Sequence, residues 1–348
     1  FGEVVRDLGI GAYLDHARNS LEATVLSATH TGSFFWGRGN NLQWGLEART
    51  ERINDRLSEW YVVDSAGYSI PQSSGAVLEL NTSVKTKIDL ESVRTSAYVQ
   101  NAWEWKTGRD RSWALVAGVR GQNWSYNGQT VFSPRLRLAY HPGWRKVVAA
   151  GDTVPRDYSF WFATGVYYQP PFYRELRDFN GVLNPDVKAQ KSIHFILGMD
   201  RQFKMWDRPF KFSTEAYYKA LSDLNPYELD NVRIRYYAKN NAKGYATGID
   251  MKLNGEFIKG VESWASLSVM QTEEDIDGDF YYRTYNAAGE RTDAIDTQDR
   301  TPVDSVRVEA GHIPRPTDQR VSFALFFQDE MPRWPTFKVH LNLVFGTS

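Results

Sequence analysis

Residues 245–253 read Tyr-Ala-Thr-Gly-Ile-Asp-Met-Lys-Leu, a strict alternation of larger, mostly apolar side chains with small or charged ones. A period of two predicts a β-strand that has one apolar face and one polar face. Helical spacing is poor in almost every other part of the chain, so the protein is expected to be all-β. The same alternation recurs in four further segments, at residues 135–140, 192–200, 320–327 and 337–345.

The expected strands are long and their connections are of two kinds. Several strands exceed the usual soluble length of about 5–6 residues and match the roughly 9–11 residues of a membrane crossing. One set of connections is mostly compact, whereas the other includes the long segments 63–84, 170–190 and 274–317, as in outer-membrane barrels. The pattern predicts a transmembrane antiparallel β-barrel of about twelve strands, at residues 21–31, 40–62, 85–105, 112–126, 130–142, 157–169, 191–203, 209–224, 231–254, 262–273, 318–328 and 335–346.

Aromatic residues support a membrane location. The 348 residues include 12 Trp, 19 Tyr and 19 Phe. Trp and Tyr favour the boundary between lipid and water, where they form girdles around membrane barrels. Only Trp60 and Trp124 fall towards the long-loop rim. The other ten tryptophans lie near the short-turn rim: Trp36, Trp44, Trp103, Trp105, Trp113, Trp144, Trp161, Trp206, Trp264 and Trp334.

Composition and motifs exclude several classes of protein. A net charge of −1 does not suit nucleic-acid binding, and the absence of cysteine excludes a disulfide scaffold or a thiolate zinc site. A mean hydropathy of −0.51 and the lack of an apolar run near 18 residues exclude a transmembrane helix. No catalytic motif is present, so the protein is expected not to be an enzyme. The chain opens at Phe1 without a signal peptide, which indicates a processed or excised piece.

Four segments resemble the barrel domain of the TonB-dependent outer-membrane receptor family. Residues 131–140 (VFSPRLRLAY) are similar to its "sPR…l.y" strand, and residues 183–192 (LNPDVKAQKS) to its "LNP.LKPE.S" strand entry. Residues 216–224 (AYYKALSDL) and 240–250 (NNAKGYATGID) are similar to the two strand segments that follow. The four occur in the order and spacing of the family. The style of residues 41–104 resembles members from Bacteroidota.

The resemblance implies a fold, a location and a function. Residues 1–348 would form part of an outer-membrane β-barrel domain, with about 12 of the roughly 22 strands of a complete family barrel and no plug domain in this chain. The function implied is active import of a scarce, bulky nutrient, such as a siderophore, cobalamin, oligosaccharide or peptide, into a Gram-negative bacterium. The implied partners are outer-membrane lipid, the receptor's own plug domain, a TonB-type energy-coupling protein and a surface lipoprotein.

Two other functions are compatible with the same sequence pattern. The first is a passive porin-like or structural outer-membrane barrel, which would lack a plug. The second is a soluble carbohydrate-binding or carbohydrate-active all-β protein, whose tryptophans would stack on sugars and would be scattered over a cleft.

Two expected loops carry the candidate ligand-binding residues. Family members bind ligand with outer loops and the lumen wall, and aromatic and arginine side chains supply contact area and directed hydrogen bonds. An alternative for residues 170–190 is that Phe172 and Tyr173 pin the loop onto the rim. For residues 274–317 the alternative is a shield without a ligand role. The candidates are Phe172, Tyr173, Arg174 and Arg177 in the first loop, and Tyr281, Tyr282 and Arg283 in the second.

Alternation also assigns side chains to the lumen. Arg135, Arg137, Asp250 and Lys252 fall on the polar side of their strands, where plug contacts are the favoured role and ligand contacts the alternative. The same pattern assigns the side chains of residues 320–346. It places Val321, Phe323, Leu325, Leu341 and Leu343 towards lipid, and Arg320, Lys338 and His340 towards the lumen.

An acidic run at residues 273–279 contains alternate carboxylates around a glycine. Asp275, Asp277 and Asp279 could present hard oxygen ligands to Ca²⁺, although the run lacks the order of an EF-hand loop. The alternative is a solvated outer loop. Apart from this calcium, no cofactor is expected.

Overall fold

The protein is an antiparallel β-sheet with almost no other regular structure. The computed structural model describes residues 12–37, 39–64, 79–108, 110–147, 153–230, 233–258, 261–294, 296–331 and 334–347. Within these ranges, one short 3-10 helix, η2 (Tyr173–Leu176), accompanies the strands. Among the described residues, no helix has the length and apolar character needed to cross a membrane.

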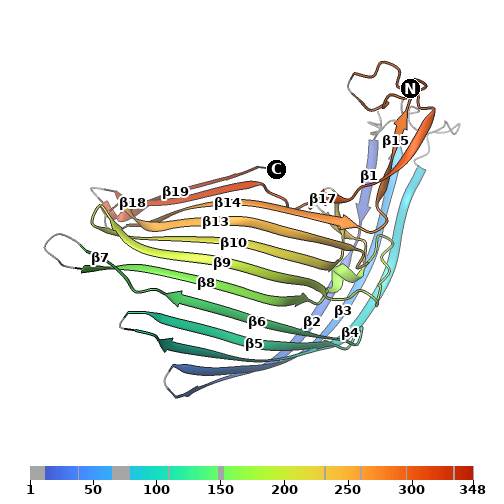
Figure 1. Ribbon diagram of the computed structural model, residues 1–348. Helices are drawn as coiled ribbons and strands as arrows, with labels where there is room; N and C mark the ends of the chain where they lie inside the picture. The colour runs from blue at the N-terminus through green and yellow to red at the C-terminus, as the bar shows by residue number, and fades with distance from the viewer. Residues whose placement is uncertain are drawn as a thin grey trace.

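Twelve long strands form one continuous meander in which each strand pairs with the next (Figure 1). The all-β prediction and the antiparallel barrel wall are therefore confirmed. The twelve strands are β2 (Ser20–Trp36), β3 (Asn40–Asp64), β4 (Glu79–Lys106), β5 (Ser112–Trp124), β6 (Gln129–His141), β8 (Thr153–Gln169), β9 (Gln190–Met205), β10 (Arg208–Leu224), β13 (Ala242–Ile258), β14 (Val261–Ile276), β18 (Val321–Met331) and β19 (Trp334–Gly346).

Shorter strands extend or accompany this sheet. Three of them pair with long strands: β1 (Ala12–Ala17) with β3, β7 (Trp144–Val147) with β8, and β17 (His312–Pro314) with β14. Two separate hairpins consist of β11 (Tyr227–Asp230) with β12 (Arg233–Tyr236), and β15 (Phe280–Tyr285) with β16 (Asp304–Glu309). Within the described chain β19 pairs only with β18, and β1 and β2 pair only with β3, so the curved sheet is not closed.

The strand connections follow the predicted alternation between two rims. One rim has tight turns, such as the two residues between β9 and β10, where Trp206 and Asp207 both have φ 55°. Left-handed values at both central positions are those of a type I′ hairpin, whose twist matches that of the strands. The opposite rim carries the connections that follow β3, β5, β8, β10 and β14. It is called the outer rim below.

Register joins the alternating residues of neighbouring strands into two faces. One row of directly paired residues crosses seven strands on the apolar face: Leu138, Phe162, Leu197, Ala216, Ile249, Val269 and Val321. Four of its large side chains, those of Phe162, Leu197, Ile249 and Val269, are solvent-exposed, with Leu197 at 62%. A continuous exposed apolar surface of this extent needs an apolar partner, and lipid is the partner for a barrel wall.

The polar face lies on the other side of the same strands. Directly paired Glu215, Asp250 and Ser268 lie on it, and register also places Arg135, Arg137 and Lys252 there. All four residues that sequence alternation assigned to this side therefore occupy it. Their contact with a plug or a ligand stays a prediction.

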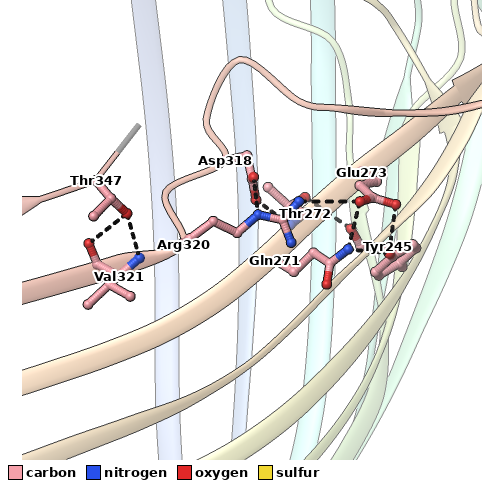
Figure 2. A network of polar contacts seen from close by, with 8 residues as sticks. All are labelled: Tyr245, Gln271, Thr272, Glu273, Asp318, Arg320, Val321 and Thr347. Carbon is pink, nitrogen blue, oxygen red and sulfur yellow. Dashed lines mark hydrogen bonds and ion pairs between the residues drawn. The ribbon is translucent and has the colours of Figure 1, made fainter.

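The assignment of residues 320–346 is confirmed except at Arg320. Leu325 pairs with Leu343 on the apolar face, while His340 stacks on Phe326 on the polar face. Arg320 was expected on the polar face, but its side chain forms ion pairs with Asp318 at 2.8 Å and with Glu273 at 3.4 Å (Figure 2). Glu273 has the same strand parity as Val269, so register places it on the apolar face. Arg320 precedes the first residue of β18, where strand alternation no longer fixes the direction of a side chain.

The aromatic girdle is only partly as expected. Most tryptophans of the short-turn rim belong to the apolar face, as in the paired Trp105 and Trp113 of β4 and β5. Trp161 and Trp264 instead lie on the polar face, where Arg137 and Lys252 cover their rings at 5.0 and 5.1 Å.

Two expected segments differ in detail. The single strand predicted over residues 231–254 is divided, because Ala238 adopts φ 53° and the chain turns before β13. The segment 274–317, expected to be a long loop, contains the β15–β16 hairpin. Tyr281 and Tyr282 pair there with Val308 and Arg307, a regularity that the mixed composition concealed.

Candidate ligand-binding site at the outer rim

The loop between β8 and β9, residues 170–189, folds over the outer end of the polar face and is called the rim loop below. Its buried Tyr173, Leu176 and Val187 join a hydrophobic cluster with residues of β3, β4 and β5, among them Leu90 and Trp124. In Figure 1 the coil of η2 lies beside β3 and β4, part of the way along these two strands. Since the rim loop spans from β8 to β3 across the polar face, this face is the inner side of the curved sheet.

Asp55 of β3 anchors the rim loop. Its side chain, 4% exposed, accepts hydrogen bonds from the Tyr173 hydroxyl at 2.5 Å and from Arg177 Nη1 at 2.8 Å. Burial and the neighbouring Asp55 carboxylate raise the pKa of the Tyr173 phenol, so it remains a donor at physiological pH. Two of the predicted ligand residues, Tyr173 and Arg177, therefore hold the loop on the rim.

Glu175 is a second buried carboxylate of the rim loop. It accepts hydrogen bonds from the Phe172 backbone N–H at 3.1 Å and from Gln190 Nε2 at 3.2 Å. Its backbone carbonyl accepts a third bond, from Asn225 Nδ2, at 2.7 Å. Burial raises the pKa of the Glu175 carboxyl, because the charged form is poorly solvated there.

Replacing Glu175 with glutamine should therefore remove the pH dependence that this carboxyl gives to the stability of the rim loop. A carboxyl whose pKa is raised by folding stabilises the fold fully below its ordinary pKa and loses this contribution as pH rises through the raised value. Hydrogen exchange of the loop amides from pH 4 to pH 8 measures the effect. The wild-type loop should lose protection relative to Glu175→Gln as pH rises, and parallel profiles would contradict the assignment.

Phe172 and Arg174 have the opposite orientation to Tyr173. Both are exposed, and the Phe172 ring meets the Tyr236 ring edge-on with centroids 6.0 Å apart. They remain accessible at the outer rim, and their contact with a ligand stays a prediction.

Cations of the polar face rest on aromatic rings. Arg135 covers the Tyr167 ring at 4.4 Å, and Tyr167 stacks on His194 at 4.2 Å. Lys219, which is directly paired with His194, lies 4.7 Å from the Tyr217 ring. Asp250 accepts a hydrogen bond from the Ser268 hydroxyl. Such cation–aromatic contacts orient the side chains but leave their charges available to a partner.

The β15–β16 hairpin presents the second group of predicted residues. Tyr281 and Tyr282 are exposed on β15, and Arg283 Nη2 donates to the Tyr281 hydroxyl at 2.7 Å. The loop that follows is ordered around buried Asn286, whose side-chain oxygen accepts from the backbone N–H groups of Ala288 and Glu290 at 3.0 and 2.8 Å. The hairpin is thus a preformed surface, and its ligand role stays a prediction.

The acidic run is spread along the end of β14 and its turn. Asp275 forms an ion pair with Lys243 at 3.3 Å, and Asp277 is exposed. Among the described residues, no three His, Asp or Glu side chains are arranged to hold a metal ion. Calcium at Asp275, Asp277 and Asp279 therefore stays an untested prediction without support from the geometry.

An ion-pair network that the sequence did not predict lies under the rim loop. Glu51 Oε2 accepts from Arg94 Nε at 3.1 Å, and the Arg94 guanidinium lies 4.0 Å from the Trp124 ring. Arg94 Nη2 also donates to the Pro171 carbonyl at 2.7 Å and so connects the network to the loop. The alternating charges of Glu47, Arg49 and Glu51 were the feature of the sequence from which this network could have been predicted.

An antiparallel meander of long strands, with an exposed apolar outer face and a charged inner face, defines part of a membrane β-barrel wall. The family model described as "TonB dependent receptor-like, beta-barrel" matches residues 6–289. The chain therefore belongs to the TonB-dependent receptor family. Comparison with curated protein sequences finds no match.

Solved structures share the fold at low sequence identity. The "Structure of the RagAB peptide transporter" is 12% identical, with a TM-score of 0.50 over 90% of this chain and 40% of that chain. The "Structure of the FpvAI-pyocin S2 complex" is 13% identical, with a TM-score of 0.51 over 94% of this chain and 39% of that chain. The chain thus spans about two fifths of the length of these structures.

Proposed function

We propose that this chain is part of the barrel of an outer-membrane receptor that imports a scarce, bulky nutrient into a Gram-negative bacterium. Family membership supports a transport role. The proposal adds capture of a siderophore, cobalamin, oligosaccharide or peptide at the outer rim, followed by import with energy from a TonB-type protein. A plug domain would fill the lumen, and a surface lipoprotein would be a further partner. No covalent chemistry is required.

The observation that carries the proposal is the rim loop fixed over the inner, polar face. Asp55 and the cluster around Leu176 hold this loop in one conformation. Phe172 and Arg174 are thereby presented at the outer rim at little entropic cost on binding, which favours capture of a dilute ligand.

Growth under nutrient limitation tests the proposal. A strain lacking the receptor gene and a strain lacking the energy-coupling protein are supplied with ferric siderophores, cobalamin, oligosaccharides or peptides as the limiting nutrient. Both strains should fail to grow on the same nutrient class. Growth that needs the receptor but not the coupling protein would support a passive porin-like barrel instead.

Removing the β15–β16 hairpin tests its place in the ligand vestibule. Deletion of residues 280–309 takes out both strands together and should weaken binding of the nutrient to whole cells about tenfold or more. Surface expression, measured with an antibody, is the control. Unchanged affinity at normal expression would make the hairpin a shield without a ligand role.

A further inference from the structure

A small cavity lies beneath Pro170 at the outer end of the polar face. Its volume is about 160 Å³, and β3, β4 and β5 supply most of its wall. The charged and aromatic lining residues are Glu47, Arg49, Arg94, Arg120 and Trp124. The cavity therefore joins the rim loop to the charged inner wall.

Positive charge exceeds negative charge in the lining of this cavity, where three arginines face one carboxylate. The Glu47 carboxylate is shared by Arg49 at 3.0 Å and Arg120 at 3.4 Å. Glu51 is likewise shared, by Arg94 at 3.1 Å and Arg49 at 3.9 Å. Three guanidinium groups thus contact two carboxylates, of which Glu47 belongs to the cavity lining and Glu51 lies outside it. The Glu175 carboxylate of the rim loop is a further negative charge close to Arg94, outside the cavity lining.

Hydrogen-bond donors are also in excess. Arg49 Nε, Arg120 Nε and Trp124 Nε1 are buried and have no acceptor in the described part of the chain. Trp124 itself is only 3% exposed. Buried donors without acceptors are uncommon in folded proteins and call for an additional acceptor, such as a bound anion or water.

We propose that this cavity binds a single carboxylate or phosphate group of the nutrient, an inference that rests on the proposed import function. The cavity volume of about 160 Å³ is below the roughly 300–1,000 Å³ of pockets that hold a drug-sized ligand, so it suits one oxyanion group but not a whole bulky nutrient. Guanidinium groups bind both oxyanions with paired hydrogen bonds. The remainder of the ligand extends along the polar face.

The rim loop takes part in this site through Arg94. Arg94 stacks on Trp124, which fixes the plane of its guanidinium, and donates to the Pro171 carbonyl of the rim loop. Exposed Phe172 directly follows Pro171. An anionic group in the cavity therefore places the rest of the ligand next to the residues that the outer rim presents.

Calorimetric titration of the full-length receptor in detergent at low ionic strength tests the site. Inorganic phosphate and acetate are titrated separately, and the tighter of the two identifies the oxyanion class. Arg120→Gln should weaken binding about tenfold or more, because it removes a charged donor. Glu47→Gln should strengthen binding about tenfold, because it removes a carboxylate that competes for two arginines.

Arg52→Gln is the matched control. Arg52 lies on β3, the strand of Glu47, but points to the other face, where it pairs with Glu91 at 3.2 Å. Its removal should therefore leave the affinity unchanged.

Far-UV circular dichroism confirms that each variant is folded, and Glu47→Gln alone decides the question if Arg120→Gln does not fold. Absence of binding to the wild type, equal affinity across the variants, or weaker binding by Glu47→Gln would overturn the proposal. Nutrient-dependent growth is scored separately, so failure of this site leaves the import function standing.

Discussion

Replacing Leu341 with arginine should destabilise the full-length receptor in lipid vesicles by about 2–4 kcal/mol. Leu341 is 55% exposed near the middle of β19 and pairs with Phe327 on the apolar face. A lipid-facing arginine near mid-bilayer must be removed from water or must distort the membrane, and either response costs free energy. Denaturant unfolding in vesicles gives the difference from the wild type.

The adjacent residue is the matched control for this substitution. Asn342 follows Leu341 on the same strand and lies on the polar face, opposite Phe326. Asn342→Arg should therefore cost much less, about 0–1 kcal/mol, because its guanidinium reaches water in the lumen. Equal costs at the two positions would show that the two faces of β19 are wrongly assigned.

Replacing Asp55 with alanine should release the rim loop, with a loss of about 3–5 kcal/mol of local stability. The substitution leaves Arg177 as a partly buried cation and removes the acceptor of the Tyr173 hydroxyl. Removing one partner of a buried ion pair costs more free energy than the pair contributes to stability, because the remaining charge is poorly solvated. Hydrogen exchange of the amides between residues 173 and 187 measures the change.

Asp89→Ala is the control for the loss of a carboxylate from the same region. Asp89 of β4 is exposed and pairs in register with Asn54, one residue from Asp55 on the opposite face. Its removal should leave exchange in the rim loop unaltered. Similar exchange in the two variants would mean that the Asp55 contacts do not hold the loop.

The strands and their two faces were predictable because alternation is a local property of the chain. The apolar or polar chemistry of each residue in 245–253 is enough to predict its face. The same alternation then fixes the register between β13 and β14. Alternation does not predict the direction of side chains beyond the ends of strands. Arg320 lies outside β18, and its side chain points to the nearest carboxylates, those of Glu273 and Asp318.

The partners within the rim site were not predictable in the same way. Asp55 and Tyr173 are 118 residues apart in the chain, and only the curvature of the sheet brings them together. Neither residue differs in type from the many exposed Asp and Tyr residues of this sequence. Likewise, the placement of Trp161 on the polar face depends on its strand parity, which its nearness to the short-turn rim does not reveal.

The central claim is that one face of this sheet contacts lipid and the other lines the lumen. The 348-residue chain itself contributes no cysteine. In a full-length receptor freed of any other cysteine, single cysteines are introduced at Ile249, Asp250, Met251 and Lys252 of β13 and labelled with bimane. Brominated lipids should quench the label strongly at residues 249 and 251 and weakly at residues 250 and 252. Quenching without this alternation would contradict the claim.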